Sequence, residues 1–126
     1  MGGDEMGRFQ IEFYERGNGE QPARDFIDSL DKKMRAKMLM LLTLLQDNGH
    51  ELREPYSKYL SEGIFELRAK AGTDISRVLY FFYVDHRIIL TNGFIKKTQK
   101  TPAQEMEKAK KYRADYLSRR RASDER

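Results

Sequence analysis

The residues best suited to chemistry are two arginines and an aromatic residue on neighbouring predicted strands. Arg68, Arg77 and Phe94 fall in three successive segments of alternating polar and apolar residues. The planar fork of an arginine suits a phosphodiester, and an exposed aromatic ring can stack a base of single-stranded RNA. Like charges placed directly opposite on a sheet are destabilising. Two facing arginines with no carboxylate on their row therefore predict a phosphate clamp that an anion completes.

Two short predicted turns set the register of this row. The first hairpin is expected to close around residues 71–74, which places the two arginines opposite each other. The second is expected to close at Asp85-His86, with Val84 facing Arg87, which places Phe94 opposite the second arginine. The three strands of this antiparallel meander are expected at residues 63–70, 75–84 and 87–94.

Two less specific interpretations of the arginine row stay open. Each arginine could pair with a surface acid such as Glu66 or Asp74, or the register could be shifted by one residue. Under either interpretation the row needs no bound anion to balance its charges.

The elements that must position the row follow an α+β pattern. A strand is expected at residues 9–13, and Pro22 suits the first position of a helix that follows. Asp31 is the predicted N-cap of a second helix, which ends at Asn48-Gly49. A connector containing Pro55 leads into the meander. The last helix starts with Thr101 as N-cap, Pro102 at the first helical position and Gln104 completing a capping box.

The second helix carries more apolar residues than one buried stripe needs. Leu39, Met40 and Leu44 lie beside the main stripe, so the helix either packs in a thick core or offers a surface to a partner. Residues 1–126 form one domain by length, with residues 1–8 and 119–126 expected to be flexible.

The charge is concentrated near the C-terminus. The net charge is +4, but residues 96–121 hold ten Lys or Arg and only three Asp or Glu. Such a segment suits a polyanion or an acidic protein, and is also common on solvated helix faces. The chain has no cysteine and no apolar run of membrane-spanning length, so we expect no disulfide, no membrane contact and a cytoplasmic location.

Most catalytic schemes find no support in the sequence. The only histidines, His50 and His86, fall in predicted loops, and no zinc motif, magnesium carboxylate cluster or phosphate-binding glycine loop occurs. We therefore expect no cofactor, and RNA cleavage would proceed by attack of a 2′-hydroxyl on the adjacent phosphate. No general base is obvious, and the choices are Lys58, Lys96 and Lys97.

An ordered set of short motifs resembles the RelE/ParE toxin superfamily, and most closely its HigB-like, phage-derived branch. The set spans about residues 8–118: Lys58-Tyr59-Leu60, residues 63–68, Arg77-Val78-Leu79-Tyr80, Asn92-Gly93-Phe94-Ile95-Lys96-Lys97-Thr98, Pro102 and a helix containing Ala109.

The resemblance implies a compact RelE-like fold and an endoribonuclease that cuts messenger RNA in the ribosomal A site. It also implies a cognate antitoxin of helix-turn-helix type, through which alone operator DNA would be bound. By position, Arg68 and Arg77 match arginines that hold the scissile phosphate. The catalytic set is thus Arg68, Arg77, Lys96 and Lys58, and the RNA-binding set is Lys97, Phe94 and Lys100.

One departure from the family concerns acid/base chemistry. Some members use a histidine or a C-terminal tyrosine, whereas Tyr112 and Tyr116 here fall in an apolar helical stripe and are expected to be core. Two other functions therefore stay open: a ParE-like, non-enzymatic inhibitor of DNA gyrase, and an inactive relative that regulates its operon.

Overall fold

The computed structural model describes residues 8–96 and 101–124. Its three α-helices are α2 (Pro22–Ser29), α3 (Lys32–Asn48) and α4 (Ala103–Asp124), with a 3₁₀ turn, η1 (Gly49–Glu51), after α3. Its strands are β1 (Gln10–Phe13), β2 (Ser57–Ser61), β3 (Ile64–Ala71), β4 (Asp74–Tyr83) and β5 (Arg87–Lys96).

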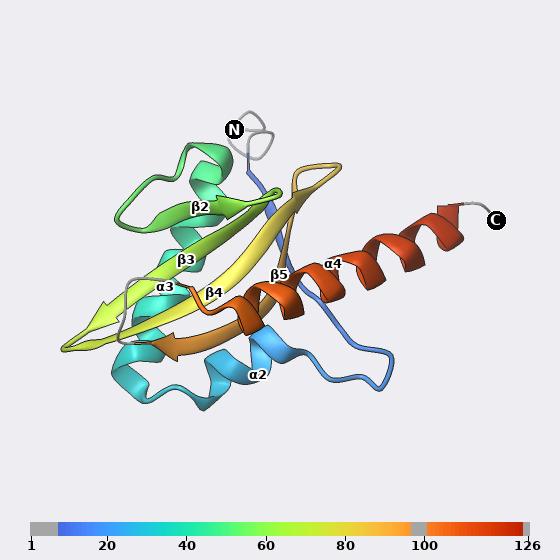
Figure 1. Cartoon of the computed structure of the whole chain (residues 1–126). Coiled ribbons are helices and arrows are strands. Elements are labelled where there is room, and N and C mark those ends of the chain that lie inside the picture. The colour runs from blue at the N-terminus through green and yellow to red at the C-terminus, as the bar shows by residue number, and fades with distance from the viewer. Residues whose placement is uncertain (1–7, 97–100, 125–126) are drawn as a thin grey trace.

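The strands form one mixed sheet in the order β1-β5-β4-β3-β2, in which only β1 and β5 run parallel. Figure 1 shows α3 behind this sheet, α2 below β5, and α4, in orange and red, in front of the sheet. The larger core lies on the α2 and α3 side, and two smaller apolar clusters lie beneath α4. The fold is therefore a three-layer α+β arrangement, with helices on both faces of the sheet.

α2 begins, and α3 begins and ends, where the sequence predicts. Pro22 is the first residue of α2, and the Asp31 side chain accepts a hydrogen bond of 2.9 Å from the Met34 amide at the start of α3. Gly49 follows α3 with a positive φ, next to the Phe9 ring. α3 buries one side only, because Leu39 and Met40 are 48% and 53% exposed. The interpretation of α3 as a helix in a thick core is wrong for these two residues.

The sequence did not predict β2. Residues 57–61 fall in the connector that the sequence predicts before the meander. In the structure they pair antiparallel with β3 and extend the meander to four strands. β2 is short and holds only one fully buried side chain, Ser57, so it carries no clear apolar alternation. A buried hydrogen bond of 2.5 Å between the hydroxyls of Ser57 and Tyr80 ties it to β4 across the sheet.

The predicted row Arg68–Arg77–Phe94 is confirmed, although one of its supporting turns is not. Tyr83, not Val84, faces Arg87, because the turn takes three residues and both Asp85 and His86 have positive φ. A bulge then adds one residue to β5 between the partners of Tyr80 and Leu79. The bulge restores the predicted pairing further along the sheet.

The last helix begins one residue later than predicted, at Ala103, and the Thr101 hydroxyl donates to Glu66. Residues 119–124 continue the helix, and Arg120 contacts Glu12 of β1. No helix in the described ranges combines the length and apolar character that a membrane crossing needs.

The Tyr80 hydroxyl makes stability depend on alkaline pH. Burial raises the pKa of Tyr80 to about 12, from an ordinary value of 10.0. The folded state holds this proton more tightly than the unfolded state does. The resulting contribution to the unfolding free energy is therefore fully present below pH 10 and is lost as the pH rises towards 12. Between pH 9 and 11 the native chain should lose about 1 kcal/mol more unfolding free energy than Tyr80→Phe.

Urea denaturation at several pH values measures this difference. Tyr59→Phe is the matched control, because Tyr59 is exposed and its replacement should leave the native pH slope unchanged. Equal slopes for native and Tyr80→Phe chains would contradict the assignment.

Candidate functional site

The centre of the candidate site is a carboxylate buried between two arginines. Glu66 lies on β3, with Oε1 3.0 Å from Nε of Arg68 and Oε2 3.4 Å from Nη1 of Arg77. Glu66 and Arg77 are both 0% exposed, whereas Arg68 is 14% exposed at its side chain. One negative charge thus separates the two positive charges that the strand pairing brings together.

The expectation that no carboxylate lies near the arginine row is therefore wrong. Side chains two residues apart on a strand share a face, so Glu66 stands beside Arg68, and each of its oxygens contacts one arginine. The alternative interpretation, in which Glu66 pairs with the arginines, is confirmed, except that Glu66 is buried and not at the surface. The only sequence signal for this contact is the alternation of side chains along a strand, which puts Glu66 and Arg68 on the same face.

The start of α4 covers this charged cluster. The Thr101 hydroxyl donates a hydrogen bond of 2.6 Å to Oε2 of Glu66, the oxygen that also faces Arg77. The side-chain amide of Asn92 donates to the backbone carbonyl and the carboxylate of Glu105, at 3.2 and 3.0 Å, which fixes the first turn of α4 on β5. Burial lowers the pKa of Arg77, and the charge of Glu66 opposes that shift.

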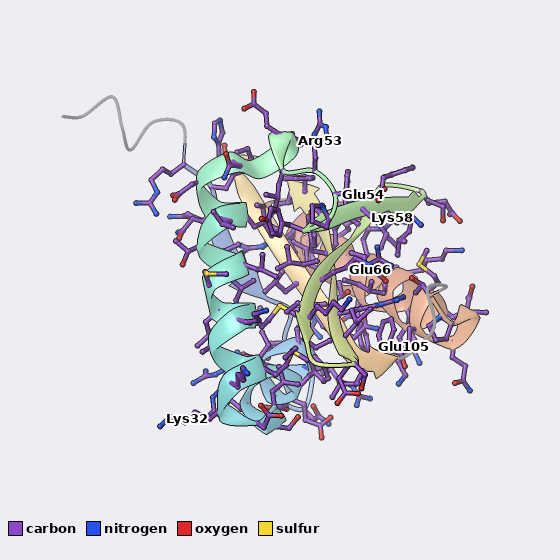
Figure 2. The ribbon with its side chains drawn as sticks, turned by 90° about the vertical axis from the view of Figure 1, so that its left-hand side faces the viewer. Lys32, Arg53, Glu54, Lys58, Glu66 and Glu105 are labelled. Atoms are coloured by element: carbon purple, nitrogen blue, oxygen red, sulfur yellow. The ribbon has the colours of Figure 1, made fainter. Side chains whose placement is uncertain are left out.

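A groove beside β2 borders this cluster, and its lining includes Glu66 but neither Arg68 nor Arg77. Lys58 is exposed and lies opposite Glu66 in the pairing of β2 with β3. In Figure 2, Lys58 and Glu66 lie on the neighbouring strands β2 and β3 and Glu105 lies on α4, whereas Lys32 lies at the far end of α3. The groove has a volume of about 250 Å³ and is lined by Lys58, Tyr59, Leu60, Ser61, Glu66, Thr101 and Met106.

The other predicted site residues are placed less directly at this groove. Phe94 lies opposite Arg77, but its partly buried ring packs against the cluster beneath α4 that contains Leu79 and Ala109. Lys96 is the last residue of β5, and the position of its side chain lies outside the described part of the structure. Lys97 and Lys100 lie outside the described residues altogether.

The histidines and the C-terminal tyrosines lie apart from the groove. His50 stacks on Phe82, and His86 stacks on Phe9. Tyr116 is buried against Phe81, which confirms that it is a core residue. Tyr112, partly buried in the same cluster, stacks on Tyr14.

The comparisons with known proteins identify a family. The family model described as "Phage derived protein Gp49-like (DUF891)" matches residues 25–114. The matched range includes most of α2, all of α3 and β2–β5, and the first half of α4, so it contains the whole groove and the arginine row. No curated protein matches the chain significantly.

Removing the buried carboxylate should destabilise the protein more than removing an exposed one. Glu66→Met takes away the carboxylate that both arginines contact, and the loss should be about 3–5 kcal/mol of unfolding free energy. Glu107→Met, which removes an exposed partner of Lys110, should change stability by less than about 0.5 kcal/mol.

The double variant Glu66→Met/Arg77→Met distinguishes charge burial from lost packing. It should be more stable than Glu66→Met alone, because an uncompensated buried charge costs more than an apolar replacement of the pair. Urea denaturation measures all three variants. A double variant less stable than the single one would show that Glu66 does not act by compensating Arg77.

Proposed function

The chain belongs to the family of phage-derived Gp49-like proteins, and from this premise we propose that it is the toxin of a type II toxin–antitoxin pair that cuts messenger RNA on the ribosome. The resemblance of its motifs to HigB-like toxins supports this proposal. The observation that carries it is the groove at β2, where the exposed Lys58 lies opposite Glu66, the buried carboxylate that also contacts Arg68.

The proposed reaction needs positive charge at fixed positions. The 2′-hydroxyl attacks the adjacent phosphate and loses its proton, the bond to the 5′-oxygen breaks, and that oxygen takes up a proton. Negative charge grows on the phosphate oxygens in the transition state, where fixed cations stabilise it most. In the proposal, Lys58 contacts the phosphate from the lining of the groove, and the partly exposed guanidinium of Arg68, held by Glu66, adds a second positive charge.

Arg77 has a different role in the proposal. Its side chain is 0% exposed beneath the start of α4, so it acts through Glu66 as a positioning residue and does not touch RNA. Glu66 in turn fixes the guanidinium of Arg68, which saves the entropy of ordering it when the substrate binds. The general base remains a choice among Lys58, Lys96 and Lys97.

Inducible expression of the chain alone in a bacterium, with 5′-end mapping of messenger RNA within minutes, tests the proposal. The native chain should stop growth and create new ends inside translated codons. Lys58→Met should reduce cleavage by roughly 100-fold, the usual effect of losing one transition-state contact. Lys32→Met is the matched control, since it removes the same charge at the far end of α3 (Figure 2) and should leave cleavage unchanged.

The other outcomes separate the competing functions. Growth arrest with intact transcripts would replace the proposal with a ParE-like inhibitor of DNA gyrase. Unimpaired growth with abundant folded protein would indicate an inactive relative that regulates its operon. Full toxicity of a folded Lys58→Met chain would remove the groove from the proposal.

A substrate variant tests the nucleophile separately. Ribosomes programmed with a message that carries a single 2′-deoxy nucleotide at the mapped cut site should resist cleavage there, because the attacking hydroxyl is missing. The unmodified message should yield a 2′,3′-cyclic phosphate at the new 3′ end. Equal cleavage of both messages would show that water or another group attacks the phosphate.

A further inference from the structure

A second cavity lies at the β1 edge of the sheet, separate from the groove at β2. A cavity of about 600 Å³ runs along β1, with residues of α2 on one wall and residues of α4 on the other. β1 is the end strand of the sheet, so no described strand occupies the space between these walls. The C-terminal half of α4 extends past the strands in Figure 1.

The backbone of β1 is oriented to accept another strand. The Gln10 amide donates to the His86 carbonyl at 2.7 Å, and the Tyr14 amide donates to the Leu90 carbonyl at 2.9 Å. Alternate residues of a strand point their backbone groups to opposite sides, so the amide and carbonyl groups of Ile11 and Phe13 face away from β5. An edge of this kind is a template for an incoming strand.

The two walls of the cavity differ in chemistry. On the α2 side, the half-buried side chains of Ile11 and Phe13 pack against the main core, and the exposed Arg24 lies above them. On the α4 side the lining residues include Arg119 and Arg120. Arg120 also lies 3.2 Å from the carboxylate of Glu12 on β1, which holds the wall against the strand.

We propose that the β1 edge binds an extended segment of a partner protein, which adds a sixth strand to the sheet. Successive side chains of that segment would face opposite walls, so the fitting sequence alternates apolar residues towards Ile11 and Phe13 with acidic residues towards Arg119 and Arg120. RNA fits this cavity less well, because the outward backbone groups and apolar side chains of Ile11 and Phe13 suit a peptide strand. The proposal does not depend on RNA cleavage.

A labelled peptide of alternating glutamate and valine, Glu-Val-Glu-Val-Glu-Val-Glu, is the probe. Titrated into the full ¹⁵N-labelled chain, it should bind saturably and shift the amide signals of Ile11, Phe13 and the C-terminal half of α4. A Lys-Val peptide of the same length should bind at least about tenfold more weakly than the Glu-Val peptide, since its charges repel the arginines. A Glu-Val peptide N-methylated at alternate residues should also lose affinity, because it cannot pair with the edge.

Two variants localise the binding. Ile11→Pro removes an amide that points away from β5, so the sheet should stay folded while peptide affinity falls at least about tenfold. Arg119→Glu should weaken binding, whereas Lys111→Glu, with the same change of charge at another exposed position of α4, should not.

The proposal fails if the Glu-Val peptide does not bind, or if its shifts fall elsewhere on the molecule. It also fails if the N-methylated peptide binds as well as the parent, a comparison that needs only the native chain and holds even if Ile11→Pro does not fold. None of these outcomes bears on cleavage at the groove beside β2.

Discussion

An ionised carboxylate inside a protein loses hydration worth several kcal/mol, and only close opposite charges and hydrogen bonds can offset that loss. Glu66 meets this requirement with two arginines, one on its own strand and one on the next, and with the Thr101 hydroxyl above. The same constraint acts on the arginines, which would repel each other across the strands without it. The pairing of β3 with β4 and the seating of α4 on the sheet therefore both meet at this one side chain.

α4 contacts two separate parts of the sheet because it is longer than the sheet face that it crosses. Its first turn is held on β5 by the hydrogen bonds from Asn92 to Glu105, and its last turns reach β1, where Arg120 contacts Glu12. Between them, the hydroxyl of Tyr14, the residue after β1, donates to Asp115 at 2.6 Å, and burial raises the pKa of Tyr14 to about 12. The groove at β2 and the cavity at β1 are thus held by opposite ends of one helix.

The arrangement separates the residue that can touch a substrate from the residue that supports it. Arg68 and Arg77 look equivalent in the sequence, since both are arginines on strands and face each other. Burial distinguishes them: the side chain of Arg68 is 14% exposed, and that of Arg77 is 0% exposed. In the proposed function Arg68 therefore adds a positive charge beside the phosphate, and Arg77 keeps the charge balance beneath it.

The sequence by itself determined the helices, three of the five strands in one meander, the first strand, and the row of Arg68, Arg77 and Phe94. These depend on local rules: period-two alternation, a proline at a first helical position, and Asp31 as a cap. Tertiary structure decided what no local rule contains. β2 exists because β3 pairs with it, and the bulge in β5 offsets a turn that the sequence predicted one residue too short. Only packing of α4 on the sheet buries Glu66 and Arg77, because burial depends on which distant segments come together and not on neighbours along the chain.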